Sequence, residues 1–103
     1  MIITTVDSIP GKETEPLGIV QGTTVQSVNV LKDFGSGFKS LVGGELKSYN
    51  EMMNKARSLA VDRMVQSAKN LDADAVVGVR YTTSSIMQGA AEILVYGTAV
   101  RYI

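Results

Sequence analysis

The sequence lacks two residue types altogether, because its 103 residues include no cysteine and no histidine. The chain therefore has no disulfide bridge, no thiol nucleophile, no thiolate or imidazole ligand for a metal, and no histidine to act as general base. It also lacks the side chain whose charge normally changes near neutral pH. We expect no metal or other cofactor, and the composition favours a non-catalytic protein over an enzyme.

An excess of charge of one sign is also missing, as are long apolar runs. Lys and Arg total 10, Asp and Glu total 10, and the two signs are interspersed. Sequence-independent binding to nucleic acid needs surplus basic residues, so we expect no nucleic-acid partner. No window approaches the roughly 18 apolar residues of a membrane span, and the start MIITTVDSIPG has no basic region. We expect a cytoplasmic location and no membrane partner.

Runs rich in Val, Ile and Thr predict strands in the N-terminal part of the chain. They cover residues 2–6 and 17–30, and Gly22 lies within the second run. A glycine inside a strand pattern marks a bulge or a close backbone approach. The second run is therefore either one strand bent at Gly22 or two strands joined there.

Two helices are predicted next. Residues 32–42 have helical spacing, with Asp33 as N-cap and an end at Gly43 and Gly44. A longer helix follows, because Ser48 and Glu51 form a capping box. Apolar residues then recur at three- and four-residue steps over about six turns. They are Tyr49, Met52, Met53, Ala56, Leu59, Ala60, Met64, Ala68 and Leu71.

The C-terminal part predicts an exit turn over residues 72–74 and a strand over 75–83. A hairpin loop over 84–89 and a long final strand over 91–103, interrupted at Gly97, complete the chain. The order strand, strand, short helix, long helix, strand, strand predicts an α+β fold. It is a mostly antiparallel sheet packed on one long helix, with additional short N-terminal strands and a short helix, in a single domain of 103 residues.

The final strand carries apolar residues on both faces, whereas one helix can cover only one face. Leu94, Tyr96, Val100 and Tyr102 share one parity, and Ile93, Val95, Ala99 and Ile103 share the other. Its thirteen residues span about 43 Å, against roughly 34 Å for the diameter of a compact chain of this length. The strand therefore bends at Gly97 or pairs with a neighbour. We expect a homo-oligomer; the alternative is that N-terminal strands cover the second face.

Polar residues around the two helices form the candidate ligand-binding set. They are Lys32, Asp33, Glu45, Tyr49 and Arg57. The alternative for Arg57 is a partly buried ion pair or a capping contact. A third hypothesis makes Lys32, Glu45, Tyr49 or Arg57 the working groups of an enzyme with an interfacial cleft.

Six blocks resemble the YbjQ-like family of small bacterial and archaeal proteins, often labelled heavy-metal-binding. They are LGIVQG (17–22), NVLKDF (29–34), GGELKSY (43–49), KARSLA (55–60), NLDADAVVGVRY (70–81) and YGTAV (96–100). The resemblance implies a β-α-β-β type subunit with extra short strands, assembled into a ring-shaped homopentamer. The family's metal label points to a C-x-x-C ligand pair, which has no counterpart in this cysteine-free chain.

Together these observations favour a cytoplasmic, non-catalytic homo-oligomer, pentameric by resemblance, that binds a small ligand or a partner where subunits meet. The alternative is a metal-ion-binding protein that uses oxygen ligands such as Asp72, Asp74 or Glu92.

Overall fold

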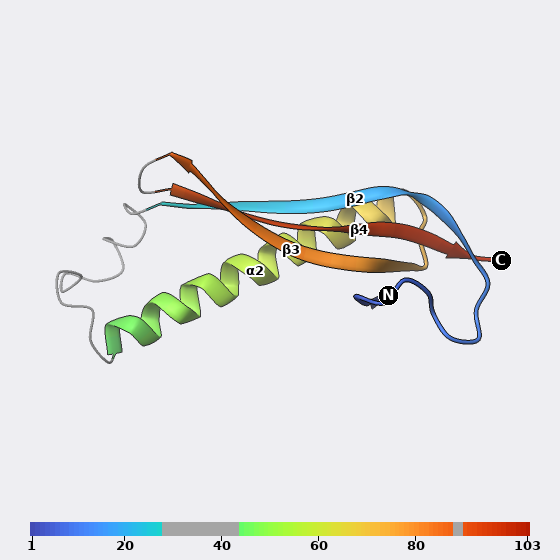
Figure 1. Cartoon of the computed structure of the whole chain (residues 1–103), viewed down its shortest axis with the longest axis horizontal. Helices are drawn as coiled ribbons and strands as arrows, with labels where there is room; N and C mark the ends of the chain where they lie inside the picture. Colours follow the sequence, from blue (N-terminus) through green and yellow to red (C-terminus); the bar gives the residue numbers. More distant parts are fainter. Residues whose placement is uncertain (28–43, 88–89) are drawn as a thin grey trace.

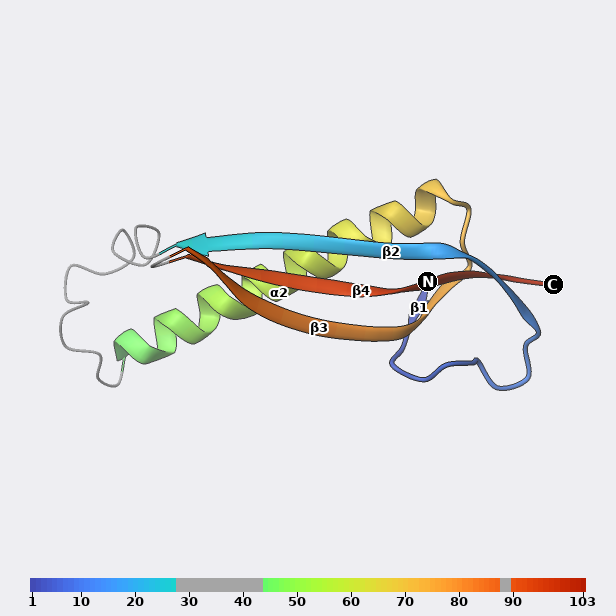
Figure 2. The same cartoon turned by 45° about the horizontal axis from the view of Figure 1, so that its top comes forward.

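The computed structural model describes residues 1–27, 44–87 and 90–103. Its elements are β1 (Ile2–Ile3), β2 (Thr14–Ser27), α2 (Gly44–Asn70), β3 (Ala75–Met87) and β4 (Ala90–Tyr102). The strands form one sheet in the order β1-β3-β4-β2, in which β1 pairs with β3 in parallel and the other pairs are antiparallel. The helix α2 lies across one face (Figures 1 and 2). The predicted α+β fold is thus confirmed, and the predicted short helix over 32–42 lies outside the described residues.

The long strands set the shape of the molecule, which measures 54 × 25 × 18 Å. β4 runs through Gly97 without interruption, so the predicted break there is wrong. The irregularities lie instead in β3, whose register against β4 shifts between Val77 and Arg80 and again between Ser85 and Met87. A Cβ on Gly97 would stand 2.8 Å from Cγ1 of Val76. Gly97 therefore allows tight packing at the bulge of the neighbouring strand.

Gly22 is the point at which α2 comes closest to the sheet. A Cβ at this position would lie 1.9 Å from the carbonyl oxygen of Ala60 and 2.6 Å from the amide nitrogen of Met64. The expectation of a close backbone approach is therefore confirmed. The alternative of two strands joined at Gly22 is wrong, because β2 is one strand, and its register shifts between Pro16 and Gly18 instead.

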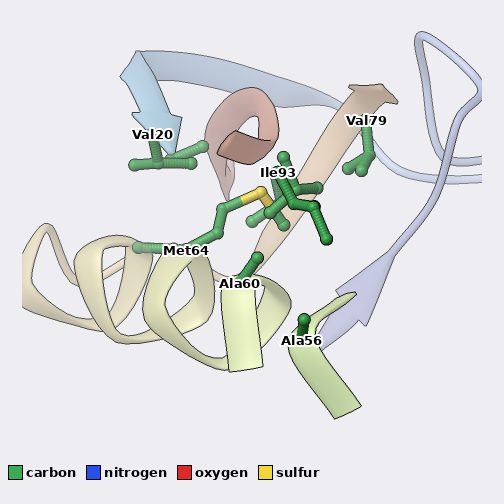
Figure 3. Close-up of a cluster of buried hydrophobic side chains, with 10 residues drawn as sticks. Val20, Ala56, Ala60, Met64, Val79 and Ile93 are labelled. Carbon is green, nitrogen blue, oxygen red and sulfur yellow. The ribbon is translucent and has the colours of Figure 1, made fainter. Parts of the chain in front are cut away.

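The core lies between α2 and the inner face of the sheet, the face turned toward the helix (Figure 3). The buried helix residues recur at every fourth position: Met52, Ala56, Ala60, Met64 and Ala68. They meet sheet residues that include Val20, Val76, Val79, Ile93 and Val95. Small alanines let the helix lie close to the sheet, so its buried stripe is narrow. Leu59 and Leu71 fall outside it and are exposed, so their assignment to the stripe was wrong.

The two ends of α2 differ in how well the sequence predicts them. The helix begins at Gly44, so Ser48 lies inside it and the predicted capping box does not mark its start. At the other end, Asp72 adopts a φ of 59°. Its amide donates to the carbonyl of Lys69, and the amide of Ala73 donates to that of Ala68. This is the Schellman arrangement, and it confirms the predicted exit turn.

Two strand boundaries also differ from expectation. β3 continues to Met87, so residues 84–87 belong to the strand and were wrongly predicted as loop. They lie at an exposed end, where serines can occupy a strand without showing an apolar pattern. The first strand is shorter than the predicted 2–6, because only residues 2 and 3 form a regular ladder with β3.

Candidate functional site: two ends of one sheet

The outer face of the sheet, the face away from α2, is covered at one end by the N-terminal segment. Ile9 is buried there against Ala75, Val77 and Val100, with Tyr102 packed at the rim. The alternative that N-terminal residues cover the second face is therefore correct for this part of the sheet. We call it the covered end, and it includes residues 75–79 of β3.

The same segment also protects the outer edge of β3 at the covered end. The amide of Thr4 donates to the carbonyl of Val76 (3.0 Å), and the amide of Val79 donates back to the carbonyl of Thr4 (3.0 Å). Arg80 closes the boundary, since its guanidinium donates to the carbonyl of Thr5 at 2.9 Å. Backbone groups of β3 are thus satisfied within the chain up to this point.

Charged residues near the covered end are used in local contacts. Arg101 forms an exposed ion pair with Glu15, whose hydrogen bond and charge raise the pKa of Arg101 above its usual value. Asp74 accepts a hydrogen bond from the amide of Tyr102 at 2.8 Å. Lys12 lies 5.2 Å from the centre of the Tyr102 ring. These contacts fasten the ends of β2, β3 and β4 to one another.

The remainder of the sheet, formed by residues 21–27 of β2, 81–87 of β3 and 90–96 of β4, is the open end. Register places three strands in common rows on its outer face, for example Gln21 beside Tyr96 beside Arg80. The exposed apolar residues of this face are Met87 (66%), Val25 (55%) and Tyr96 (39%). Polar residues alternate with them, so the predicted second apolar face is confirmed only in part.

The outer edge of β3 at the open end has no strand beside it in the described part of the chain. β1 pairs only with Ala75 and Val76, at the opposite end of β3. Beyond Arg80, the described side chains of the strand are exposed on both faces, because α2 contacts mainly β2 and β4. Tyr81, on the inner face, is 56% exposed. Residues 81–87 thus form a strand held on one side only.

Within residues 1–27, 44–87 and 90–103, the second free edge belongs to β2, which ends the sheet on the side opposite to β3. Neither residues 16–27 nor residues 81–87 contain a charged side chain. Natural proteins usually guard edge strands with charges, prolines or bulges, since open backbone groups recruit other strands. On β2, Arg63 donates a hydrogen bond to the carbonyl of Thr23. Because neither segment carries a charged side chain, both edges are suited to accepting a strand from another chain.

Of the five predicted ligand-binding residues, Arg57 is the one whose side chain lies in the described part of the structure. Lys32 and Asp33 lie outside the described ranges, and Glu45 and Tyr49 are placed only as backbone positions in the first turns of α2. Arg57 is exposed and donates to Oδ1 of Asn54 at 2.9 Å, so it makes neither a buried ion pair nor a capping contact.

What sequence reasoning missed is that β3 continues over residues 84–87, which are part of the free edge. The available signal was the absence of glycine, proline, asparagine and aspartate between Tyr81 and Met87. Residues of that kind normally mark a turn, and their absence favours continuation of the strand.

Of the three carboxylates considered as metal ligands, Glu92 lies far from Asp72 and Asp74. Asp72 occupies the turn after α2, Asp74 is bonded to the amide of Tyr102 and, through its own amide, to the carbonyl of Val100. Glu92 precedes Val100 by eight strand residues, or about 27 Å. Residues 1–27, 44–87 and 90–103 contain no cluster of three or more potential Asp or Glu ligands. These residues do not fit a heavy-metal site, since such ions favour sulfur and nitrogen donors.

Comparisons with known proteins agree with the fold. A family model named YbjQ and described as "Putative heavy-metal-binding" matches residues 1–103. A UPF0145 protein of Clostridium novyi (strain NT) is 61% identical over 103 residues, covering 100% of both chains. One of Alkaliphilus metalliredigens (strain QYMF) is 53% identical with the same coverage.

A solved structure extends the comparison to three dimensions. The crystal structure of a protein of unknown function from Pediococcus pentosaceus, of the DUF74 family, has a TM-score of 0.71 at 19% identity. The match covers 100% of this chain and 98% of the other, so the two share a fold. No helix in the described ranges has both the length and the apolar composition needed to cross a membrane.

Proposed function

The chain belongs to the YbjQ family, and from this premise we propose that it is a non-catalytic homo-oligomer of the cytoplasm. In this proposal the subunits form a pentameric ring and bind a small ligand or a partner at their boundaries. The pentamer is the assembly that the family resemblance implies.

The observation that carries the proposal is the open end of the sheet. Exposed apolar side chains, among them Val25 and Met87, lie beside strand edges that carry no charged side chain. Exposed apolar patches and unguarded edges mark interaction surfaces in soluble proteins. A second subunit would cover both features together.

The ring places a condition on the contact. An odd-membered ring needs a heterologous interface, in which each subunit presents two different surfaces to its neighbours. The free edges of β2 and β3 are different and lie on opposite sides of the sheet. This arrangement supports a ring over a simple twofold dimer.

A ligand at such a boundary would meet the polar rows of the open end. The row of Gln21, Tyr96 and Arg80 offers an amide, an aromatic ring and a guanidinium on three neighbouring strands. Sites for small molecules often form where subunits meet, because two surfaces together exclude more water than one. The chemistry of this row favours a polar ligand with hydrogen-bond acceptors.

Light scattering coupled to gel filtration tests the assembly. At micromolar concentration the proposal expects a mass about five times the 11.0 kDa of one chain. A mass of one chain at every concentration would contradict it.

A further inference from the structure

We propose that the two free edges of the sheet form one joint. Residues 81–87 of β3 in one subunit add as a strand beside the outer edge of β2 in the next. This inference rests on the proposed oligomer and names the surfaces and the partner, a second copy of this chain.

The direction of the backbone groups in β3 supports the first half of the joint. The amides of Gly78 and Val79 already point outward, because they donate to the carbonyls of Val6 and Thr4 in the N-terminal segment. Side alternation along a strand then directs the amides of Tyr81, Thr83 and Ser85 to the same edge. Up to Arg80, the N-terminal segment supplies acceptors to the outward amides of β3. Beyond Arg80, a strand of a second copy would supply them.

The outer edge of β2 supports the second half. Its residues 19–27 are comparable in length to residues 81–87, and pairing the two edges would bury no charged side chain from either. On this edge, the guanidinium of Arg63 donates a hydrogen bond to the backbone carbonyl of Thr23. An added strand takes the place of this guanidinium at the carbonyl.

The positions of the edges favour this pairing over pairing of two β3 edges. In the order β1-β3-β4-β2, the free edges lie on opposite sides of one sheet. Pairing of β3 with β3 would close a dimer and leave both β2 edges open. Pairing of β3 with β2 joins subunits head to tail and leaves no edge open once the ring closes.

Cross-linking tests the joint directly, because a cysteine-free chain reacts only at introduced thiols. Ser84 and Gln21 are both exposed on the outer face, one on each edge strand. Within one subunit they lie two strands apart and offset along the sheet, about 16 Å between backbones. The double variant Ser84→Cys/Gln21→Cys, treated with a short bismaleimide, should give a ladder up to five chains on a denaturing gel. Each single variant is the matched control and should give single chains.

A second experiment removes the edge. Thr83→Pro deletes one outward amide, and edge strands tolerate proline where the amide faces solvent. We expect the mass to fall to that of one chain while the helical circular dichroism is retained. Thr83→Lys places a charge on the same edge and should give the same loss if the proline variant fails to fold. Ser58→Lys, at an exposed position of α2, adds the same charge elsewhere and should leave the mass unchanged.

The outcomes separate the joint from the oligomer. A native mass of one chain overturns both proposals. A native oligomer that gives no ladder and survives both Thr83 variants overturns the joint and leaves the oligomer standing. Cross-linked dimers from Ser84→Cys alone would show pairing of β3 with β3 and overturn the joint. Loss of the oligomer only in the Thr83 variants, with the ladder present in the double variant, supports it.

Discussion

The two halves of β3, residues 75–79 and residues 81–87, pair with the same neighbour, β4, but their surroundings differ. In residues 75–79, Ala75 and Val76 are fully buried, and the outer edge is bonded to the N-terminal segment. In residues 81–87, the described side chains are exposed on both faces and the outer edge is free. The comparison shows that the chain completes its own sheet at one end only. The other end has the properties of an interface.

The boundary between the halves is built into the strand. The bulge between Val77 and Arg80 turns two consecutive amides outward to the N-terminal segment, and Gly78 adopts a φ of 62° there. Arg80 then holds the carbonyl of Thr5. The N-terminal segment thus supplies hydrogen-bond partners to the edge of β3 at the covered end. We propose that a neighbouring subunit supplies them at the open end.

The largest effect on stability is expected at Gly22, where α2 lies closest to the sheet. Gly22→Ala places a methyl group against the backbone of α2 at Ala60, and the helix has to move away. We expect a loss of about 3 kcal/mol in the free energy of unfolding, measured by urea denaturation. Ser84→Thr adds a methyl group at the open end and should change it by less than about 0.5 kcal/mol. Equal stabilities for both variants would contradict the close approach.

The same substitution at the two ends tests the comparison itself. Ile9 is buried at the covered end, whereas Ile19, on the edge strand β2 next to the open end, is 80% exposed. Ile9→Ala should cost about 2 kcal/mol of unfolding free energy, because it leaves a cavity over Val77 and Val100. Ile19→Ala should cost less than about 0.5 kcal/mol in a monomeric background such as Thr83→Pro. A large loss from Ile19→Ala in that background would mean that the chain covers its own open end.

A smaller loss of stability is expected at Arg80, at the boundary between the covered end and the open end. Arg80→Gln removes the hydrogen bond to Thr5 and loosens the N-terminal segment, at a cost of about 1 kcal/mol. Hydrogen exchange of the amides of Gly78 and Val79 should become faster. Arg57→Gln, which removes a contact within the exposed surface of α2, is the matched control and should leave these rates unchanged.

No effect is expected from metal ions. Asp74 lies at the covered end and Glu92 at the open end, so one ion cannot bind both carboxylates. Calorimetric titration of chelator-treated protein with copper, zinc, nickel or calcium should give no binding heat. A saturable heat with any of these ions would contradict our conclusion that these oxygen ligands do not fit a metal site. It would support metal binding, as the family's description states.

The sequence predicts best those elements whose residues face a core. The four-residue recurrence from Met52 to Ala68 predicts α2, and the β-branched runs predict most of β2 and β4. Prediction fails where burial gives no pattern, as in residues 84–87, which are exposed strand. It also fails at the start of α2, because the motif at Ser48 is compatible with a helix interior as well as with a cap.

The candidate site was harder to predict than the fold. Polar residues such as Arg57 attract attention in a sequence, but this guanidinium donates its hydrogen bond to the side-chain amide of Asn54 on its own helix. A free strand edge consists of backbone groups, which are the same in every residue except proline. Only the strand order, set by pairings between distant parts of the chain, shows that residues 81–87 lie at an edge.

Amide hydrogen exchange in the native protein at micromolar concentration tests the central claim most directly, because it compares the two halves of β3 in one experiment. If a second copy covers the open end, the amides of Tyr81, Thr83 and Ser85 exchange as slowly as that of Val79, whose acceptor lies within the chain. Slow exchange at Val79 together with rapid, unprotected exchange at the other three amides would contradict the account.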